Sequence, residues 1–152
     1  MQKEFIGRGS TKNLMGELEQ LDANRIFLVT ARESHESCGA KTKLDSLLKN
    51  HKVVNFPATP NPSFGKAMSG AELYIKTGCD LIIAIGGGSA IDVAKSINAF
   101  QSHPGKELAV ATGLEPITNK LAPLVAIPTT AGTGSESTHF AVIYVDGKKY
   151  SL

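Results

Sequence analysis

The sequence has no tryptophan, and only two cysteines, Cys38 and Cys79, occur among its 152 residues. The two cysteines stand far apart and form no Cys-x-x-Cys pair, so we expect free thiols in a reducing cytoplasm. The four histidines show neither His-x-x-x-His nor His-Glu-x-x-His spacing, and no cysteine or aspartate cluster accompanies them. The sequence therefore predicts no metal site in this chain.

Long apolar segments and a charge excess are also missing. No apolar run approaches the roughly 20 residues that a membrane-spanning helix needs. The amino-terminal residues lack the apolar core and cleavage site of a signal peptide. The formal net charge is +2, with lysine and arginine scattered along the chain, which gives no sign of a nucleic-acid-binding surface. We therefore expect a cytoplasmic protein without a membrane or nucleic-acid partner.

A chain of this length fits one domain, and two alternating patterns define its expected architecture. Short aliphatic segments bounded by polar or turn residues predict buried parallel strands at 25–30, 52–56, 80–86 and 123–130. Apolar residues at helical spacing predict helices between them at 11–21, 39–50, 63–78 and 89–100. This alternation indicates an α/β fold, with a Rossmann-like, mainly parallel sheet flanked by helices. Such sheets bind ligands beyond the carboxyl ends of their strands.

The remaining segments predict a loop and a hairpin. Residues 101–122 contain two prolines and two glycines and are expected to form a loop. Pro57 is expected to end the second strand, because proline cannot donate a hydrogen bond to a sheet. Residues 141–152 predict a hairpin with its turn at Asp146-Gly147. Because a hairpin strand ends abruptly at Leu152, we expect more protein to follow in the parent sequence.

Three consecutive glycines, Gly86-Gly87-Gly88, lie where the third predicted strand turns into a helix. The first amides of a helix and its dipole favour an anion, and Ser89 adds a hydroxyl donor or an N-cap. In the alternative, the glycines only let strand and helix approach each other. The pattern is not the common dinucleotide fingerprint, because Ile91 stands at the third glycine position and no acid follows at the usual distance. Nor does it contain the lysine of a P-loop.

A second candidate loop, "PTTAGTGSEST" at 128–138, follows the fourth predicted strand directly. Its threonines and serines, together with two glycines, make a segment rich in hydroxyl donors. Two such loops at neighbouring strand ends would converge on one ligand. The alternative is a purely structural turn, which the same residue types also favour.

Together, "GGGSAIDVAK" at 86–95 and "PTTAGTGSE" at 128–136 resemble the iron-containing (group III) alcohol dehydrogenase family, within the dehydroquinate synthase-like fold. "NPS" at 61–63, "FIGRGSTKNL" at 5–14 and Lys148-Lys149 are similar to the same family. The resemblance runs from about Phe5 to Leu152. It implies that residues 1–152 form an NAD(P)-binding domain and that the helical, metal-binding C-terminal domain is absent from this chain.

The resemblance also implies which residues approach the dinucleotide. Gly87, Gly88 and Ser89 would bind the pyrophosphate, and Asp92 would lie near the nicotinamide. Thr129 and Thr130 would line the adenine side. Thr133, Ser135 and Thr138 would continue the hydroxyl-rich loop, and Asn61 and Lys149 match positions that approach the cofactor. For Asp92 the alternative is an acid that complements the helix dipole. For Lys149 it is an exposed hairpin lysine.

One departure from the family concerns the cofactor. Members that prefer NAD carry an aspartate after the first strand, whereas this sequence has Ala31 followed by Arg32. Without that carboxylate, a 2′-phosphate is not repelled, and Arg32 could pair with it. We hypothesise NADP tolerance or preference; in the alternative, Arg32 is merely exposed.

The second departure concerns the metal. Family members bind iron or zinc through an aspartate and three histidines of a helical second half, and this chain contains no such set, so no catalytic residue is assigned here. The implied parent enzyme interconverts a small alcohol and an aldehyde or ketone with NAD(P), and we expect a homo-oligomer. The alternatives are a stand-alone nucleotide- or phosphate-binding module, or another enzyme of the fold, such as a glycerol or glycerol-phosphate dehydrogenase or a dehydroquinate synthase-like lyase.

Overall fold

The computed structural model describes residues 2–31 and 39–152. Its centre is a parallel sheet with the strand order β2-β1-β3-β4. The strands are β1 (Arg25–Ala31), β2 (Lys52–Ala58), β3 (Leu81–Gly86) and β4 (Leu124–Pro128). Every residue of β3 is buried, as its uninterrupted apolar sequence predicts for a central strand.

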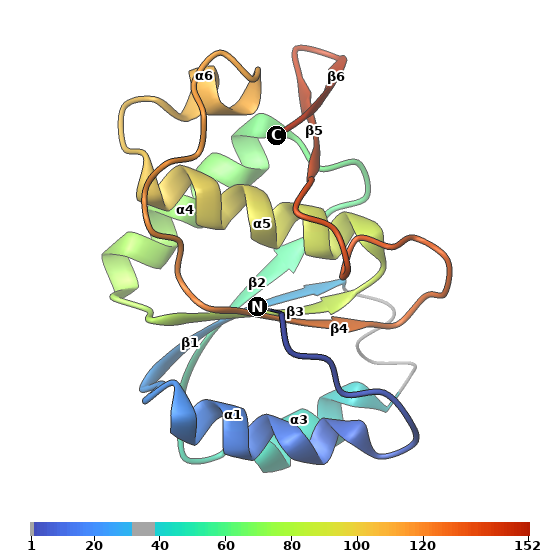
Figure 1. Cartoon of the computed structure of the whole chain (residues 1–152). Helices are drawn as coiled ribbons and strands as arrows, with labels where there is room; N and C mark the ends of the chain where they lie inside the picture. Colours follow the sequence, from blue (N-terminus) through green and yellow to red (C-terminus); the bar gives the residue numbers. More distant parts are fainter. Residues whose placement is uncertain (1, 32–38) are drawn as a thin grey trace.

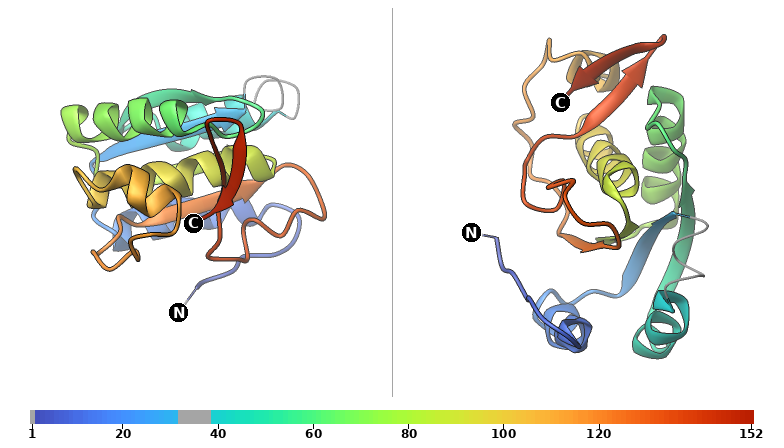
Figure 2. Two further views of the ribbon diagram at one scale, coloured as in Figure 1. Left: turned by 90° about the horizontal axis from the view of Figure 1, so that it is seen from above. Right: turned by 90° about the vertical axis from the view of Figure 1, so that its right-hand side faces the viewer.

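Helices cover both faces of this sheet, which gives three layers (Figure 1). One face carries α4 (Phe64–Thr77), α5 (Gly88–Ser102) and the short α6 (Glu107–Ala111). The other carries η1 (Ser10–Asn13), α1 (Leu14–Gln20) and α3 (Ala40–Leu47), and Figure 2 shows the same separation from two further directions. The predicted α/β, Rossmann-like architecture is confirmed.

Alternation along the strands divides the core into two clusters. Ile82 and Ala84 of β3 pack with α4 and α5 residues, whereas Leu81, Ile83 and Ile85 face the leucines of α1 and α3. Successive strand side chains point to opposite faces, so both faces of β3 must be apolar. This requirement is why the strand could be recognised from its sequence.

Several predicted boundaries were wrong; the strand expected at 123–130, for example, spans only Leu124–Pro128. The strand expected at 52–56 continues through Pro57 to Ala58, which is possible because β2 is an edge strand and an outward-facing proline costs no ladder hydrogen bond. The predicted loop 101–122 contains the end of α5 and all of α6. His103 is buried and accepts hydrogen bonds at Nε2 from the amides of Thr118 and Asn119, which folds this segment back onto α5.

Two of the apolar residues whose helical spacing predicts the helices at 11–21 and 63–78 lie on the surface rather than in the core. Leu21 follows the last turn of α1 and is 40% exposed, and Ile75 of α4 is 56% exposed. Leu21 lies beyond the last turn of α1, whereas Ile75 lies on the outer face of α4, next to Tyr74, which is 6% exposed and packs against Phe27 of β1. Gly78, a C-cap residue that the sequence predicts, ends α4 in a left-handed conformation.

The predicted hairpin is confirmed as β5 (Val142–Val145) and β6 (Lys148–Ser151). Its turn residues, Asp146 and Gly147, have φ of 48° and 76°, the pair of positive values that a two-residue hairpin turn needs. The hairpin lies on the α4–α5 side of the sheet, where the Tyr144 amide donates to the Pro62 carbonyl. Within the described ranges, the helices are too short or too polar to cross a bilayer.

Candidate functional site

The two loops singled out from the sequence are neighbours at the carboxyl edge of the sheet. Gly86, the last residue of β3, pairs in register with Pro128, the last residue of β4. The Thr129 amide then donates to the Gly86 carbonyl at 2.9 Å. The expected convergence of the two loops is therefore confirmed as a matter of geometry.

The first of the three glycines is required for packing. Gly86 has a φ of +149°, a conformation that residues with a Cβ rarely adopt. A Cβ added there would lie 2.8 Å from Ala90 Cβ and 2.9 Å from Ala31 Cβ. The close approach of strand and helix, one of the two sequence interpretations, explains this glycine.

The other two glycines face the hydroxyl-rich segment. A Cβ added at Gly87 would lie 3.0 Å from Thr130 Oγ1, and one added at Gly88 would lie 3.0 Å from Ser135 Oγ and 3.3 Å from Thr133 Cβ. Both glycines are half-buried. Backbone and hydroxyl groups thus come together here without an intervening side chain.

The start of α5 supplies the donors at this point. The helix begins at Gly88 with Gly87 as its N-cap, so the expectation that Ser89 could be the N-cap is wrong; Ser89 lies in the first turn and is exposed. A glycine cap provides no side chain for the first amides, and a helix leaves these amides without intrahelical carbonyls. The positive end of the helix dipole therefore points at the hydroxyl-rich segment.

Asp92 lies one turn further along α5 and is only 8% exposed. Burial raises the pKa of its carboxyl, while hydrogen bonds from the Val142 amide and the Ser135 hydroxyl, and the charges of Lys95 and Lys149, oppose that rise. Its carboxylate therefore joins α5 to both the hydroxyl-rich segment and the hairpin. Because Asp92 lies beyond the first turn, the helix dipole alone does not account for it.

Lys95 is the site residue that the sequence analysis missed. Its ammonium group donates to three backbone carbonyls, those of Ser135 at 2.6 Å, Thr138 at 2.5 Å and Phe140 at 2.8 Å. Burial lowers its pKa, and the charges of Asp92 and Glu136 oppose that change. The only sequence signal was a lysine three residues after an aspartate on one helical face.

Two polar atoms of the second loop are buried without a hydrogen-bond partner among the described residues: Thr129 Oγ1 and Glu136 Oε2. Buried polar atoms are nearly always paired with protein, water or ligand. Thr129 follows β4 directly, beside Gly86, so its unused hydroxyl lies at the same edge as the glycine turn. Such an atom fits a place where a bound molecule completes the hydrogen bonding.

The remaining predicted residues lie around this edge. Thr133, Thr138 and Ser89 are exposed. Asn61 is exposed in a left-handed conformation (φ 58°) just before Pro62, which binds the hairpin. Lys149 is an exposed residue of β6 that nevertheless lies near enough to influence Asp92. Ala31 ends β1 beside Gly86, whereas Arg32 lies outside the described residues.

A cavity of about 1030 Å³ runs along β4 on the other side of the hydroxyl-rich segment. Its lining includes residues 2–7, Glu136 and Lys95, but none of Gly87–Ser89. Lys95 therefore reaches the segment from the side of this cavity, away from the glycine turn. No group of three or more His, Cys, Asp or Glu residues suited to a metal occurs in the described part of the chain, so we assign no metal chemistry to it.

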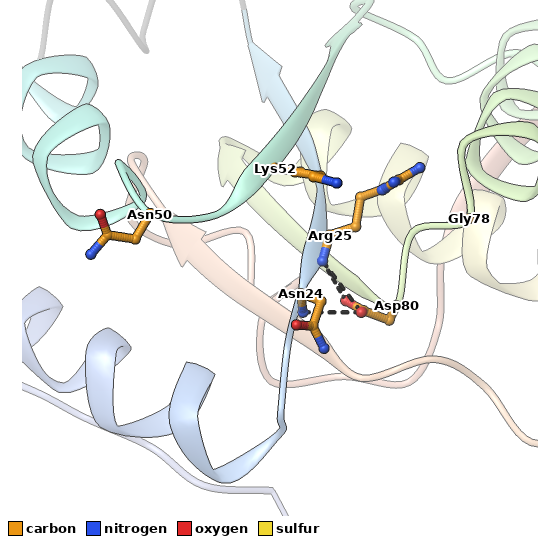
Figure 3. Close-up of a pocket in the computed structure, with 6 residues that line it drawn as sticks. All are labelled: Asn24, Arg25, Asn50, Lys52, Gly78 and Asp80. Carbon is orange, nitrogen blue, oxygen red and sulfur yellow. Dashed lines mark hydrogen bonds between the residues drawn. The ribbon is translucent and has the colours of Figure 1, made fainter.

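A smaller cavity of about 450 Å³ lies at the opposite edge of the sheet (Figure 3). It is lined by residues just before or at the start of three strands, and the Asp80 carboxylate there accepts hydrogen bonds from the amides of Asn24 (3.0 Å) and Arg25 (3.1 Å). The Arg25 guanidinium donates to the Thr77 carbonyl. These hydrogen bonds pair the Asp80 carboxylate and the Arg25 guanidinium with backbone groups of the chain itself. Parallel sheets, moreover, bind ligands at the opposite edge, beyond the carboxyl ends of their strands.

Comparison with known proteins points to one family. The family model described as iron-containing alcohol dehydrogenase matches residues 2–152. Choline dehydrogenase of Bacillus subtilis is 37% identical over 150 residues, and 4-hydroxybutyrate dehydrogenase of Cupriavidus necator is 38% identical over 146 residues. These alignments cover 96% and 93% of this chain but only 37% and 38% of the two relatives.

A solved structure agrees with the sequence comparisons. The sulfoacetaldehyde reductase of Bifidobacterium kashiwanohense, in complex with NAD+, superposes with a TM-score of 0.86 at 26% identity. That alignment covers 100% of this chain and 43% of the reductase chain. The sheet and its helices therefore correspond to the Rossmann-like domain of such enzymes.

Proposed function

This chain belongs to the iron-containing alcohol dehydrogenase family, and we propose that it binds NAD(P) where β3 and β4 end and α5 begins. It would be the nucleotide-binding part of a metal-dependent oxidoreductase that interconverts an alcohol and an aldehyde or ketone. The observation that carries the proposal is the pair Gly87 and Gly88 at the start of α5, where an added Cβ would lie 3.0 Å from the hydroxyl oxygens of Thr130 and Ser135.

The residues present fit a dinucleotide at this edge. A pyrophosphate at the start of α5 would accept hydrogen bonds from the free amides and from Ser89, with the helix dipole adding about 0.3–1 kcal/mol per favourable contact. Thr129 Oγ1, which is buried without a hydrogen-bond partner among the described residues, would form a hydrogen bond with the adenine side of the cofactor. The exposed hydroxyls of Thr133 and Thr138 would complete the lip.

Bound NAD(P)H would supply the hydride to the substrate carbonyl. Asp92 would lie on the nicotinamide side, held by Ser135 and Val142, and Lys149 and Asn61 would flank it from the hairpin and the start of α4. The metal ligands and the substrate-binding residues would belong to the part of the relatives that this chain does not match. The proposed substrate is a small alcohol or its carbonyl counterpart.

We extend the proposal to NADP. Ala31 ends β1 beside Gly86, at the point where family members that prefer NAD carry an aspartate. An alanine there repels no 2′-phosphate, so NADPH should bind at least as tightly as NADH. Dissociation constants for the two cofactors test this, and a tenfold preference for NADH would overturn it.

The experiment for the main proposal is a fluorescence titration of the chain with NADPH and NADH. The wild-type chain should saturate, and Gly88→Val should lose binding, because a branched side chain would occupy the space beside Ser135 Oγ. Circular dichroism and thermal unfolding show whether the variant is folded. Saturable binding that survives in folded Gly88→Val would reject the proposed site.

A further inference from the structure

The hydroxyl-rich segment is held in place by side chains from outside it: Lys95 of α5 donates three hydrogen bonds to it, and Gln2 Nε2 donates one to the Glu136 carbonyl at 3.0 Å. Residues 129–140 form no helix or strand, and Gly132 and Gly134 have left-handed conformations with φ of 86° and 66°. Within the segment, the Ser137 amide donates to the Gly134 carbonyl at 3.0 Å, and a longer contact of 3.4 Å joins the Ser135 amide to a threonine hydroxyl. The segment therefore has few internal hydrogen bonds that could fix its distance from the glycine turn, Gly86–Gly88.

Lys95 fixes this distance, and it uses all three of its N–H donors to do so. A lysine ammonium has three donors and no acceptor. The three carbonyls that Lys95 binds belong to Ser135, Thr138 and Phe140, which lie 40 to 45 residues away in the sequence. No N–H remains to bind a phosphate oxygen.

Asp92 complements this arrangement from the same face of α5. Its carboxylate lies close enough to Ser135 and Lys95 for both to influence its pKa, and Lys95 donates to the Ser135 carbonyl. Lys95 therefore holds Ser135, the residue whose Oγ lies 3.0 Å from the Cβ position of Gly88. The distance between the two halves of the site depends on this residue.

We propose that Lys95 is a positioning residue, which fixes residues 135–140 beside the start of α5 so that hydroxyls and amides face one nucleotide. The inference rests on the proposed function. It assigns to the lysine of the glycine-rich motif a contact with the opposite loop, in place of a contact with phosphate. Its approach from the β4 cavity, beside Glu136, agrees with this role.

The test uses Lys95→Met, which keeps the aliphatic stem and removes the donors. The control is Lys76→Met, since Lys76 is an exposed lysine in the last turn of α4. Hydrogen exchange of the nucleotide-free chain should rise by about tenfold or more at amides 133–141 in Lys95→Met, because the segment loses its anchor. Exchange in β1 and β3 should stay unchanged, and Lys76→Met should match wild type throughout.

Nucleotide binding separates a positioning role from a phosphate contact. In Lys95→Met the Kd for NADPH should rise by about tenfold or more, while its dependence on salt concentration stays that of wild type, because no charge contact with phosphate has been removed. A smaller salt dependence in the variant would instead identify Lys95 as a phosphate ligand and overturn the inference. So would unchanged affinity.

Amine labelling of the wild-type chain keeps the inference testable if Lys95→Met does not fold. Lys95 should react with an acylating reagent at least about tenfold more slowly than Lys76, because its ammonium is bound on three sides. Equal labelling, or unchanged exchange at 133–141, would refute the anchor whether or not nucleotide binds. Slow labelling and increased exchange, in a chain that binds no nucleotide, would confirm the anchor but reject both its positioning role and the proposed function.

Discussion

Replacing Gly86 and Gly88 separately by alanine should damage different properties of the protein. At Gly86 the new Cβ would lie 2.8–2.9 Å from two alanine Cβ atoms, in a backbone conformation with a φ of +149°. Overpacking costs about 1–3 kcal/mol and a left-handed conformation about 1–2 kcal/mol more. We expect Gly86→Ala to be less stable by about 2–5 kcal/mol, which lowers the Tm of a chain of this size by roughly 4–20 °C.

At Gly88 the same methyl group would meet a hydroxyl that can move. Its Cβ would lie 3.0 Å from Ser135 Oγ, at a position with no positive φ. Alanine also favours the helix by up to about 1 kcal/mol over glycine, so stability should change by no more than about 1 kcal/mol. A displaced hydrogen bond to a charged group is worth about 1.5–3 kcal/mol, so the Kd for NADPH should rise by about 10- to 100-fold.

Thermal unfolding and fluorescence titration of both variants measure the two effects. If Gly88→Ala destabilised the fold as much as Gly86→Ala, packing alone would explain all three glycines. Wild-type affinity for NADPH in folded Gly88→Ala would equally refute a phosphate contact at this glycine.

Three further predictions test the core, the alkaline stability and the cofactor preference. Gly70→Ala should destabilise the fold by about 1–3 kcal/mol in urea unfolding, because the new Cβ would lie 2.4 Å from Ile97 Cδ1; unchanged stability would show that α4 and α5 can separate. Burial raises the pKa of Tyr74 to about 12, so stability present below the unfolded pKa of about 10 should fall as pH rises from about 10 to 12. Tyr74→Phe should reduce that fall, and equal losses in both proteins would contradict the assignment. Ala31→Asp should shift the NADH-to-NADPH affinity ratio by about tenfold or more towards NADH, through repulsion of the 2′-phosphate; an unchanged ratio would show that residue 31 does not contact the ribose.

The centre of the sheet was predictable because β3, and most of β1, are buried on both faces. The run from Leu81 to Gly86 is apolar without interruption, and a parallel strand between two helical layers requires this. The position of β2 at the edge was not predictable, because the pairing of strands is a property of the whole fold. Consequently Pro57 was expected to end a strand that in fact continues through it to Ala58. The five residues of α6 were missed because they follow a proline and a glycine and are too few to show a period.

The candidate site was predictable where the chain itself marks it. Glycines and hydroxyl residues directly after two strands identify the loops, and parallel topology brings them together. The connections between the loops were not predictable, because Lys95 donates to backbone carbonyls 40 to 45 residues away, for which the sequence carries no periodic signal. Glycine is needed at position 86 for a different reason, because a side chain there would collide with Ala31 and Ala90. This was not predictable either, since β1, β3 and α5 meet only in the folded chain.

The most direct measurement is an NMR titration of the labelled chain with NADPH. We expect the resonances of the backbone amides of Gly87, Gly88 and Ser89 to shift together with those of residues 129–138 and to saturate at one Kd. Shifts confined to the cavity around Arg25 and Asp80, or no saturable shifts at all, would contradict the proposed site.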